Sequence, residues 1–80
     1  MRNIKTHHIK LASQYYNDVE QRLKNFEIRF NDRHYREGDW LVLKEWHEDS
    51  YTGRECVRQV MRVYELDAIG LKDWVAMSIN

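Results

Sequence analysis

The chain has 80 residues, of which 42% are hydrophobic and 32% charged, and its 13 basic residues balance its 13 acidic ones. A chain of this length has material for one core, so we expect a single domain over residues 1–80. The balanced charge argues against a protein that coats nucleic acid by bulk positive charge, and no apolar run approaches the ~18 residues of a transmembrane helix.

The single cysteine and the first five residues bear on where the protein works. Cys56 has no partner for an intramolecular disulfide, and the sequence holds neither a CxxC pair nor a four-ligand zinc set. Residues 1–5 lack the apolar segment of a signal peptide. We therefore expect a cytoplasmic protein without a membrane anchor, and we assign it no metal and no cofactor.

The first two elements follow from a change of period. Residues 7–11 alternate in polarity, which predicts a strand with Ile9 and Leu11 facing inward and His7 on the same face. Apolar residues then recur at steps of three and four, which is typical of a helix at about residues 13–24 that lays one stripe on a core. That stripe consists of Ala12, Tyr15, Tyr16, Val19, Leu23 and Phe26.

After the helix the period changes to two, which predicts a strand at about residues 26–30. Phe26, Ile28 and Phe30 alternate with a polar set, and we expect the three apolar residues to face inward. The polar set consists of Asn25, Glu27, Arg29 and Asn31. This strand would therefore present a chemically dense outer face, just after Lys24 at the end of the helix.

Three further strands complete the chain. Residues 40–46 form an apolar strand, the polar residues 48–53 a turn, and residues 54–66 a long β-rich segment. A connection over 67–73 leads to a final strand at 74–79, with Val75, Met77 and Ile79 inward. About five strands and one helix without βαβ alternation predict an α+β, mainly β fold, namely a small, partly closed antiparallel barrel with the helix at one end.

Lys24, Glu27 and Arg29 are the first candidates for a site. Lys24 at the helix end and the two strand residues, about 6.6 Å apart, could surround one small polar ligand. A Lys and Glu pair in a cleft can transfer protons, and an Arg fork recognises a carboxylate, a phosphate or a base edge. The alternative is a solvated face on which Glu27 and Arg29 form a surface ion pair worth roughly 0–1 kcal/mol.

Glu45 shares the parity of Leu41 and Leu43, so it points at the interior or at a cleft if those two leucines face inward. A carboxylate in such a place needs a partner or a function, because an unpaired buried acid costs several kcal/mol. The alternative is that the strand frays by residue 45 and the acid is solvated.

Arg54, Arg58 and Arg62 recur every four residues, about 13 Å apart along a strand, and form a basic stripe. The stripe could follow a nucleic-acid backbone, although pairing with acids such as Glu48 on neighbouring strands explains it better. The tryptophans at positions 40, 46 and 74 are candidates for stacking on bases or for packing at the barrel ends.

Several segments together resemble a small bacterial and phage family of unknown function, domain of unknown function family 3850, in the ASCH group of PUA-like domains. The segments are Lys24 to Arg29, Asn31 to Arg33, Gly38-Asp39, Leu41 to Leu43 with Glu45-Trp46, and Tyr51 to Arg54. The resemblance runs from about His7 to the end of the chain. It implies a PUA-like barrel with a cleft between the helix end and the barrel mouth, proposed in this superfamily to hold RNA or a modified nucleoside.

Some ASCH domains are small amidohydrolases that remove an acyl group from the exocyclic amine of cytidine derivatives. Their motif is a Lys, a Thr three residues later and a distant Glu. The resemblance matches Lys24 to that Lys, but Glu27 stands where the Thr would be. No residue aligns with the late Glu, because this chain lacks the C-terminal helical segment that carries it. Glu45 or Glu65 could take its place in space.

Our leading expectation is a noncatalytic module that binds RNA or a nucleotide-like ligand. The residues expected to line its cleft are Lys24, Glu27, Arg29, Asn31, Arg33 and Arg54, with Glu27 reading an exocyclic amine. One alternative is an amidohydrolase of N4-acylated cytidine nucleosides that uses Lys24 with Glu27 or Glu45. Another is a phage or host regulatory protein that binds a protein partner through exposed Trp and Tyr residues.

Overall fold

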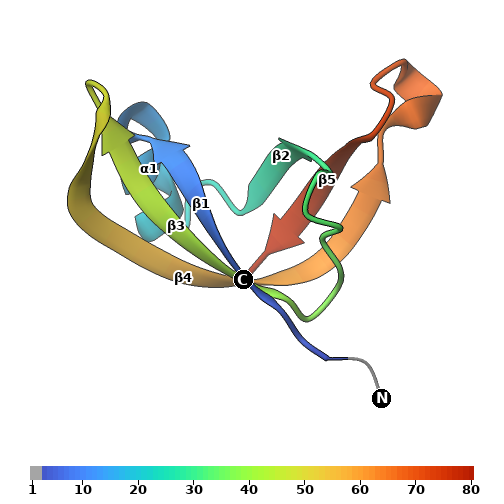
Figure 1. The fold of residues 1–80 in the computed structure, drawn as a ribbon, viewed down its shortest axis with the longest axis horizontal. Helices are drawn as coiled ribbons and strands as arrows, with labels where there is room; N and C mark the ends of the chain where they lie inside the picture. Colours follow the sequence, from blue (N-terminus) through green and yellow to red (C-terminus); the bar gives the residue numbers. More distant parts are fainter. Residues whose placement is uncertain (1–2) are drawn as a thin grey trace.

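The computed structural model describes residues 3–80, which form one five-stranded sheet and one α-helix (Figure 1). The elements are β1 (Thr6–Ala12), α1 (Ser13–Glu20), β2 (Phe26–Phe30), β3 (Trp40–His47), β4 (Ser50–Glu65), the 3-10 helix η1 (Asp67–Ile69) and β5 (Trp74–Ile79). The mainly β class with one helix is therefore confirmed. Residues 1 and 2, which belong to the segment used for the expectation about export, lie outside the described part. Within residues 3–80, no helix is long and apolar enough to cross a membrane.

The strand order is β1-β3-β4-β5-β2, so β1 and β2 are the two edges of the sheet. β1 pairs with β3 in parallel, and the other three pairings are antiparallel. The predicted antiparallel, partly closed barrel is therefore confirmed only in part. β1 and β3 are parallel, and the sheet is not closed, because no pairing joins β1 to β2 in the described chain. Parallel neighbours need a long crossover, and the chain supplies one through α1 and β2 before it returns to β3.

The long strand β4 divides the sheet into two wings, which Figure 1 shows spread apart. Its first half pairs with β3, and its second half pairs with β5 after a register shift between Val60 and Arg62. A bulge bends a strand and increases its twist, so β4 can serve both wings. The core residues of α1 and the strands are Ile9, Leu11, Tyr16, Val19, Leu41, Leu43, Val60, Val75, Met77 and Ile79, which confirms the inward faces predicted for β1 and β5.

The helix is shorter than the predicted span of residues 13–24, because α1 ends at Glu20. Arg22 takes a left-handed conformation with φ of 63°, and the next two amides both donate to the Asp18 carbonyl, at 2.8 and 3.0 Å. Arg58 Nη2 reaches from β4 to the last two carbonyls of α1, at 2.9 and 3.2 Å. These donors satisfy the helix end early, so Lys24 lies in the link to β2 and not in a helical turn.

The predicted facing of β2 is also wrong. Phe26, Ile28 and Phe30 are about half exposed, at 48%, 49% and 49%, whereas Glu27 is 3% exposed. The reason is electrostatic and geometric: β2 is an edge strand, and two cations meet Glu27 on its inner face. The strand alternates in polarity as predicted, but its buried side is the polar one.

The β3–β4 hairpin turns over two residues, not over the predicted span 48–53. Glu48 and Asp49 have φ of 48° and 67°, and His47 pairs with Ser50. Two consecutive positive φ values are the signature of the type I′ turn, whose twist matches that of the strands. The register then shifts opposite Glu45, where Gly53 adopts a φ of 96°.

Candidate functional site

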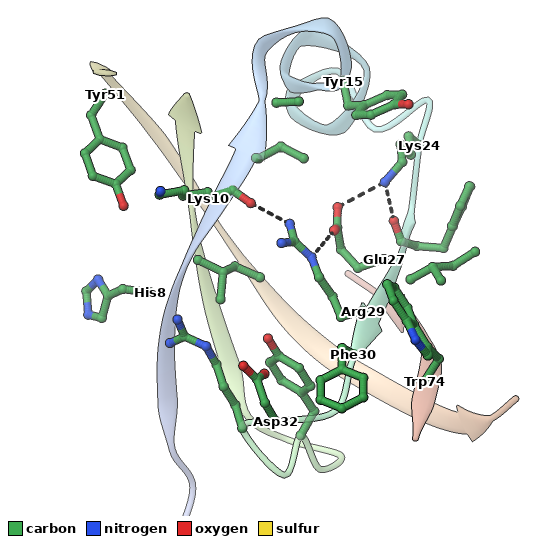
Figure 2. Close-up of a pocket in the computed structure, with 17 residues that line it drawn as sticks. His8, Lys10, Tyr15, Lys24, Glu27, Arg29, Phe30, Asp32, Tyr51 and Trp74 are labelled. Atoms are coloured by element: carbon green, nitrogen blue, oxygen red, sulfur yellow. Dashed lines mark hydrogen bonds and ion pairs between the residues drawn. The ribbon is translucent and has the colours of Figure 1, made fainter. Parts of the chain in front are cut away.

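A cleft of about 810 Å³ lies between the two free sheet edges. We call it the edge cleft. Residues of β1, the link after α1, β2 and the following loop line it, together with Trp74 of β5 and Tyr51 of β4. Figure 2 shows these side chains around β1 and β2.

The two edges direct backbone groups toward this cleft. The Asn25 carbonyl accepts from the Ile79 amide of β5 at 3.1 Å, and the Asn31 amide donates to the carbonyl of Asp73, just before β5, at 2.8 Å. Because bonding alternates along an antiparallel ladder, the even-numbered residues between them direct their amides and carbonyls to the free edge. On the opposite edge, the Lys10 carbonyl accepts from Arg29 Nη2 at 2.6 Å. A side chain thus bridges two strands that share no backbone ladder in the described fold.

Glu27 is the centre of a three-residue charge network (Figure 2). Its Oε1 accepts from Lys24 Nζ at 3.0 Å and its Oε2 from Arg29 Nε at 2.9 Å. The Lys24 ammonium also donates to the Phe26 carbonyl at 2.7 Å. The structure therefore brings together the three residues that the sequence singled out first.

Burial of Glu27 is possible only because both carboxylate oxygens are engaged by cations. Its side chain is 4% exposed, and an isolated carboxylate in that position would lose most of its hydration. Lys24 and Arg29 are 19% and 26% exposed, so each keeps contact with the cleft. Arg29 Nη1 makes no hydrogen bond with the described residues, and the network carries a net positive charge toward the cleft.

Tyr35 is a lining residue that the sequence did not predict. Its side chain is 4% exposed, its ring packs edge to face on His7 at 4.8 Å, and its hydroxyl makes no hydrogen bond within residues 3–80. Burial raises the pKa of this hydroxyl, with Arg29 and Arg33 acting in the opposite direction. A neutral phenol next to two cations can both donate to and accept from a ligand. It lies in a loop without periodicity, so only its residue type could have pointed to it.

Aromatic side chains form much of the wall of the edge cleft. Phe26, Phe30, Trp74 and Tyr15 all line it and are 39–49% exposed, and Phe30 packs edge to face on Trp74 at 6.0 Å. Arg33 also lines the cleft and forms no hydrogen bond or ion pair with the described residues. The cleft therefore offers ring faces and an uncommitted guanidinium.

Two residues predicted for the cleft lie elsewhere. Asn31 is not in the lining, and its side chain accepts from the Tyr35 amide at 2.9 Å, which shapes the loop that carries Tyr35. Arg54 binds Glu45 through Nε at 2.9 Å and Nη2 at 2.8 Å. Of the six residues expected to line a cleft, the lining includes Lys24, Glu27, Arg29 and Arg33.

Glu45 is buried, as its parity with Leu41 and Leu43 predicted, and it has the partner that such a position requires. Thr52 Oγ1 adds a hydrogen bond at 2.6 Å to the two from Arg54. The hydrogen bonds from Arg54 and then from Thr52 lower the pKa of Glu45 to about 2. The irregular register of β4 at residues 52–54 places Thr52 and Arg54 opposite Glu45. These two donors account for the burial of the Glu45 carboxylate, which stays ionised.

Of the acids considered for the amidohydrolase alternative, Glu27 contacts Lys24, whereas Glu45 and Glu65 have other surroundings. Glu45 is held by Arg54, and Glu65 lines a separate hollow of about 370 Å³ beside η1. Glu27 has both oxygens engaged. No group of three or more metal-ligating side chains is found among residues 3–80.

The arginine stripe is divided among three structural roles. Arg54 holds Glu45, Arg58 caps α1, and Arg62 pairs with Glu37 at 3.1 Å. Pairing with acids, the explanation preferred from the sequence, therefore holds for Arg54 and Arg62. Their acids differ from the Glu48 suggested by the sequence.

Two comparisons place the chain among known proteins. A family model described as Domain of unknown function (DUF3850) matches residues 6–79, a stretch that contains every described residue of the edge cleft. The chain is also 35% identical over 71 residues to an uncharacterized 12.9 kDa protein in the GpA 3′ region of Escherichia phage P2. That alignment covers 89% of this chain and 61% of the phage protein, so the chain spans less than two thirds of its relative.

Proposed function

The chain belongs to the DUF3850 family, and we propose that it is a noncatalytic module that binds single-stranded RNA or a nucleotide-like ligand in the edge cleft. One observation carries the proposal: a single aromatic-walled cleft combines Lys24, Arg29 and Arg33 with Tyr35, whose hydroxyl makes no hydrogen bond within residues 3–80. Bases are recognised by stacking on aromatic rings and by hydrogen bonds to their edges, and phosphates by Arg and Lys.

The charge of the lining supports an anionic ligand. Among the described lining residues, Lys10, Lys24, Arg29 and Arg33 outnumber Glu27 and Asp32. The chain as a whole has no net charge, so this positive excess is local. A local basic cleft attracts an anion over roughly a Debye length, about 8 Å at physiological salt.

The geometry changes the role expected for Glu27. Its two oxygens hold Lys24 and Arg29, so the carboxylate orients donors and does not itself read an exocyclic amine. Arg29 Nη1 and the Tyr35 hydroxyl are the groups best suited to meet a base edge. Arg33 and Lys24 are suited to meet phosphate oxygens.

The wider family assignment fits this site. The resemblance to the ASCH group of PUA-like domains implies a cleft between the helix end and the barrel mouth. The edge cleft lies between the link after α1 and the unclosed side of the sheet, which supports that assignment without a closed barrel.

A matched pair of variants tests the proposal. Arg33→Ala removes a lining guanidinium with no hydrogen bond or ion pair in the described chain, and Arg36→Ala makes the same change in the same loop outside the lining. We expect Arg33→Ala to weaken binding of a labelled hexauridylate and to reduce the slope of log affinity against log salt by about 0.7, with Arg36→Ala near wild type. Equal binding by all three proteins, at millimolar dissociation constants or weaker, would remove the proposal.

A further inference from the structure

The outer face of the β1–β3–β4 wing carries a second aromatic surface beside the edge cleft. Trp46 and Tyr51 are paired across β3 and β4, and their rings meet edge to face at 4.8 Å. Lys10 Nζ lies 3.8 Å from the Trp46 ring centroid, and Lys44 Nζ lies 5.0 Å from that of Tyr51. We call these four residues the Trp46 platform.

The platform shares Lys10 and Tyr51 with the lining of the edge cleft, and Lys10 links the two surfaces across β1. The Lys10 carbonyl accepts from Arg29 on the cleft side, while the Lys10 ammonium lies over Trp46 on the other side of β1. Figure 2 shows Tyr51, Lys10 and His8 on one side of β1, with Glu27, Arg29 and Trp74 on the other. All of these residues line the same cleft, so its surface continues around the β1 edge.

We propose that the bound nucleic acid is a single strand that crosses β1 at Lys10, with one nucleotide in the edge cleft and a following base on the Trp46 platform. The inference rests on the proposed function and specifies its ligand class as an oligonucleotide. Tyr51 is 49% exposed and offers its ring to solvent. Lys10 and Lys44 lie beside the rings of Trp46 and Tyr51, so their ammonium groups can bind the phosphates on either side of a stacked base. A strand of about four nucleotides, near the lower limit for small single-strand binding domains, would cover both places.

The first experiment measures affinity against ligand length, using uridine 5′-monophosphate and uridylates of two, four and six nucleotides. We expect affinity to increase up to about four nucleotides and then to level off. Tyr51→Ala and Lys44→Gln should weaken tetrauridylate binding by about 5- to 100-fold and about 3-fold respectively. Tyr64→Ala and Lys72→Gln, exposed residues outside the platform and the cleft lining, should keep the gain with length.

The three tryptophan indole signals give a second readout by NMR. The monophosphate should shift the signal of Trp74, and tetrauridylate should shift those of Trp74 and Trp46 while Trp40 stays in place. Two results would overturn this inference alone. In the first, binding is sensitive to Arg33→Ala but affinity does not increase with ligand length. In the second, affinity increases with length and Tyr51→Ala leaves that increase intact. Absence of binding by both monophosphate and oligomers would overturn it together with the proposed function.

Discussion

Replacing Glu27 by Gln tests whether the charge network organises β2. The amide keeps the shape of the side chain, but it can accept from only one of the two cations and turns an NH₂ toward the other. A hydrogen bond to a charged group contributes about 1.5–3 kcal/mol. Because Lys24 and Arg29 are 19% and 26% exposed and can regain water, we expect a loss of about 1.5–2.5 kcal/mol.

This loss is large for a chain of 80 residues, whose total stability is about 4–12 kcal/mol. It corresponds to a decrease of roughly 6–20 °C in Tm. Urea unfolding followed by circular dichroism at pH 7 measures it, with Glu48→Gln, whose side chain is 84% exposed, as the control. The same substitution should strengthen binding of anionic ligands, because the lining loses one negative charge. A Glu27→Gln variant within about 0.5 kcal/mol of wild type would refute the anchoring role of Glu27.

Three further substitutions test other parts of the fold. Arg58→Ala should lower the free energy of unfolding by about 2 kcal/mol in urea, because the carbonyls at the end of α1 lose their donors, whereas Arg62→Ala should cost under about 0.5 kcal/mol. Asp49→Gly should raise the free energy of unfolding by about 0.5–1 kcal/mol, and with it Tm, because Asp49 has a φ of 67° in the type I′ turn. A lower Tm would show that the turn has another conformation. The pKa of Glu45 is lowered to about 2, so its stabilising effect is present above the unfolded pKa of about 4.5 and is lost as pH falls toward 2. Tm measured against pH should therefore separate wild type from Glu45→Gln at pH 6 and bring the two together near pH 2, and a constant gap would contradict this assignment.

The strands could be predicted because alternation of polarity is a local property. β1, β2, β3 and β5 lie within one or two residues of the spans predicted from that alternation. The pairing order could not be predicted in the same way. Parallel pairing of β1 with β3 depends on contacts between residues more than 30 positions apart, which no local period encodes.

The facing of β2 shows why a strand pattern does not decide which side is buried. Three apolar residues favoured one face, but Glu27 with Lys24 and Arg29 forms a compensated set that the inner face accepts. Whether the charge of Glu27 is neutralised depends on where the cations lie. Lys24 lies in the link between α1 and β2, and the early end of α1 sets the path of that link.

The candidate site was predictable only where its residues are close together in the sequence. Lys24, Glu27 and Arg29 are close in sequence, so their convergence is a short-range property. Tyr35 enters the cleft from a loop, whose course depends on Asn31 and on the His7 ring. Such a contact is fixed only when the whole fold is formed.

Amide chemical shifts during titration of ¹⁵N-labelled protein with tetrauridylate test the central claim most directly. If the edge cleft is the ligand site, the largest changes will fall on Lys10, on residues 24–30 and on Tyr35. Changes confined to the β4 bulge around Arg54, or no changes at millimolar tetrauridylate, would contradict the account.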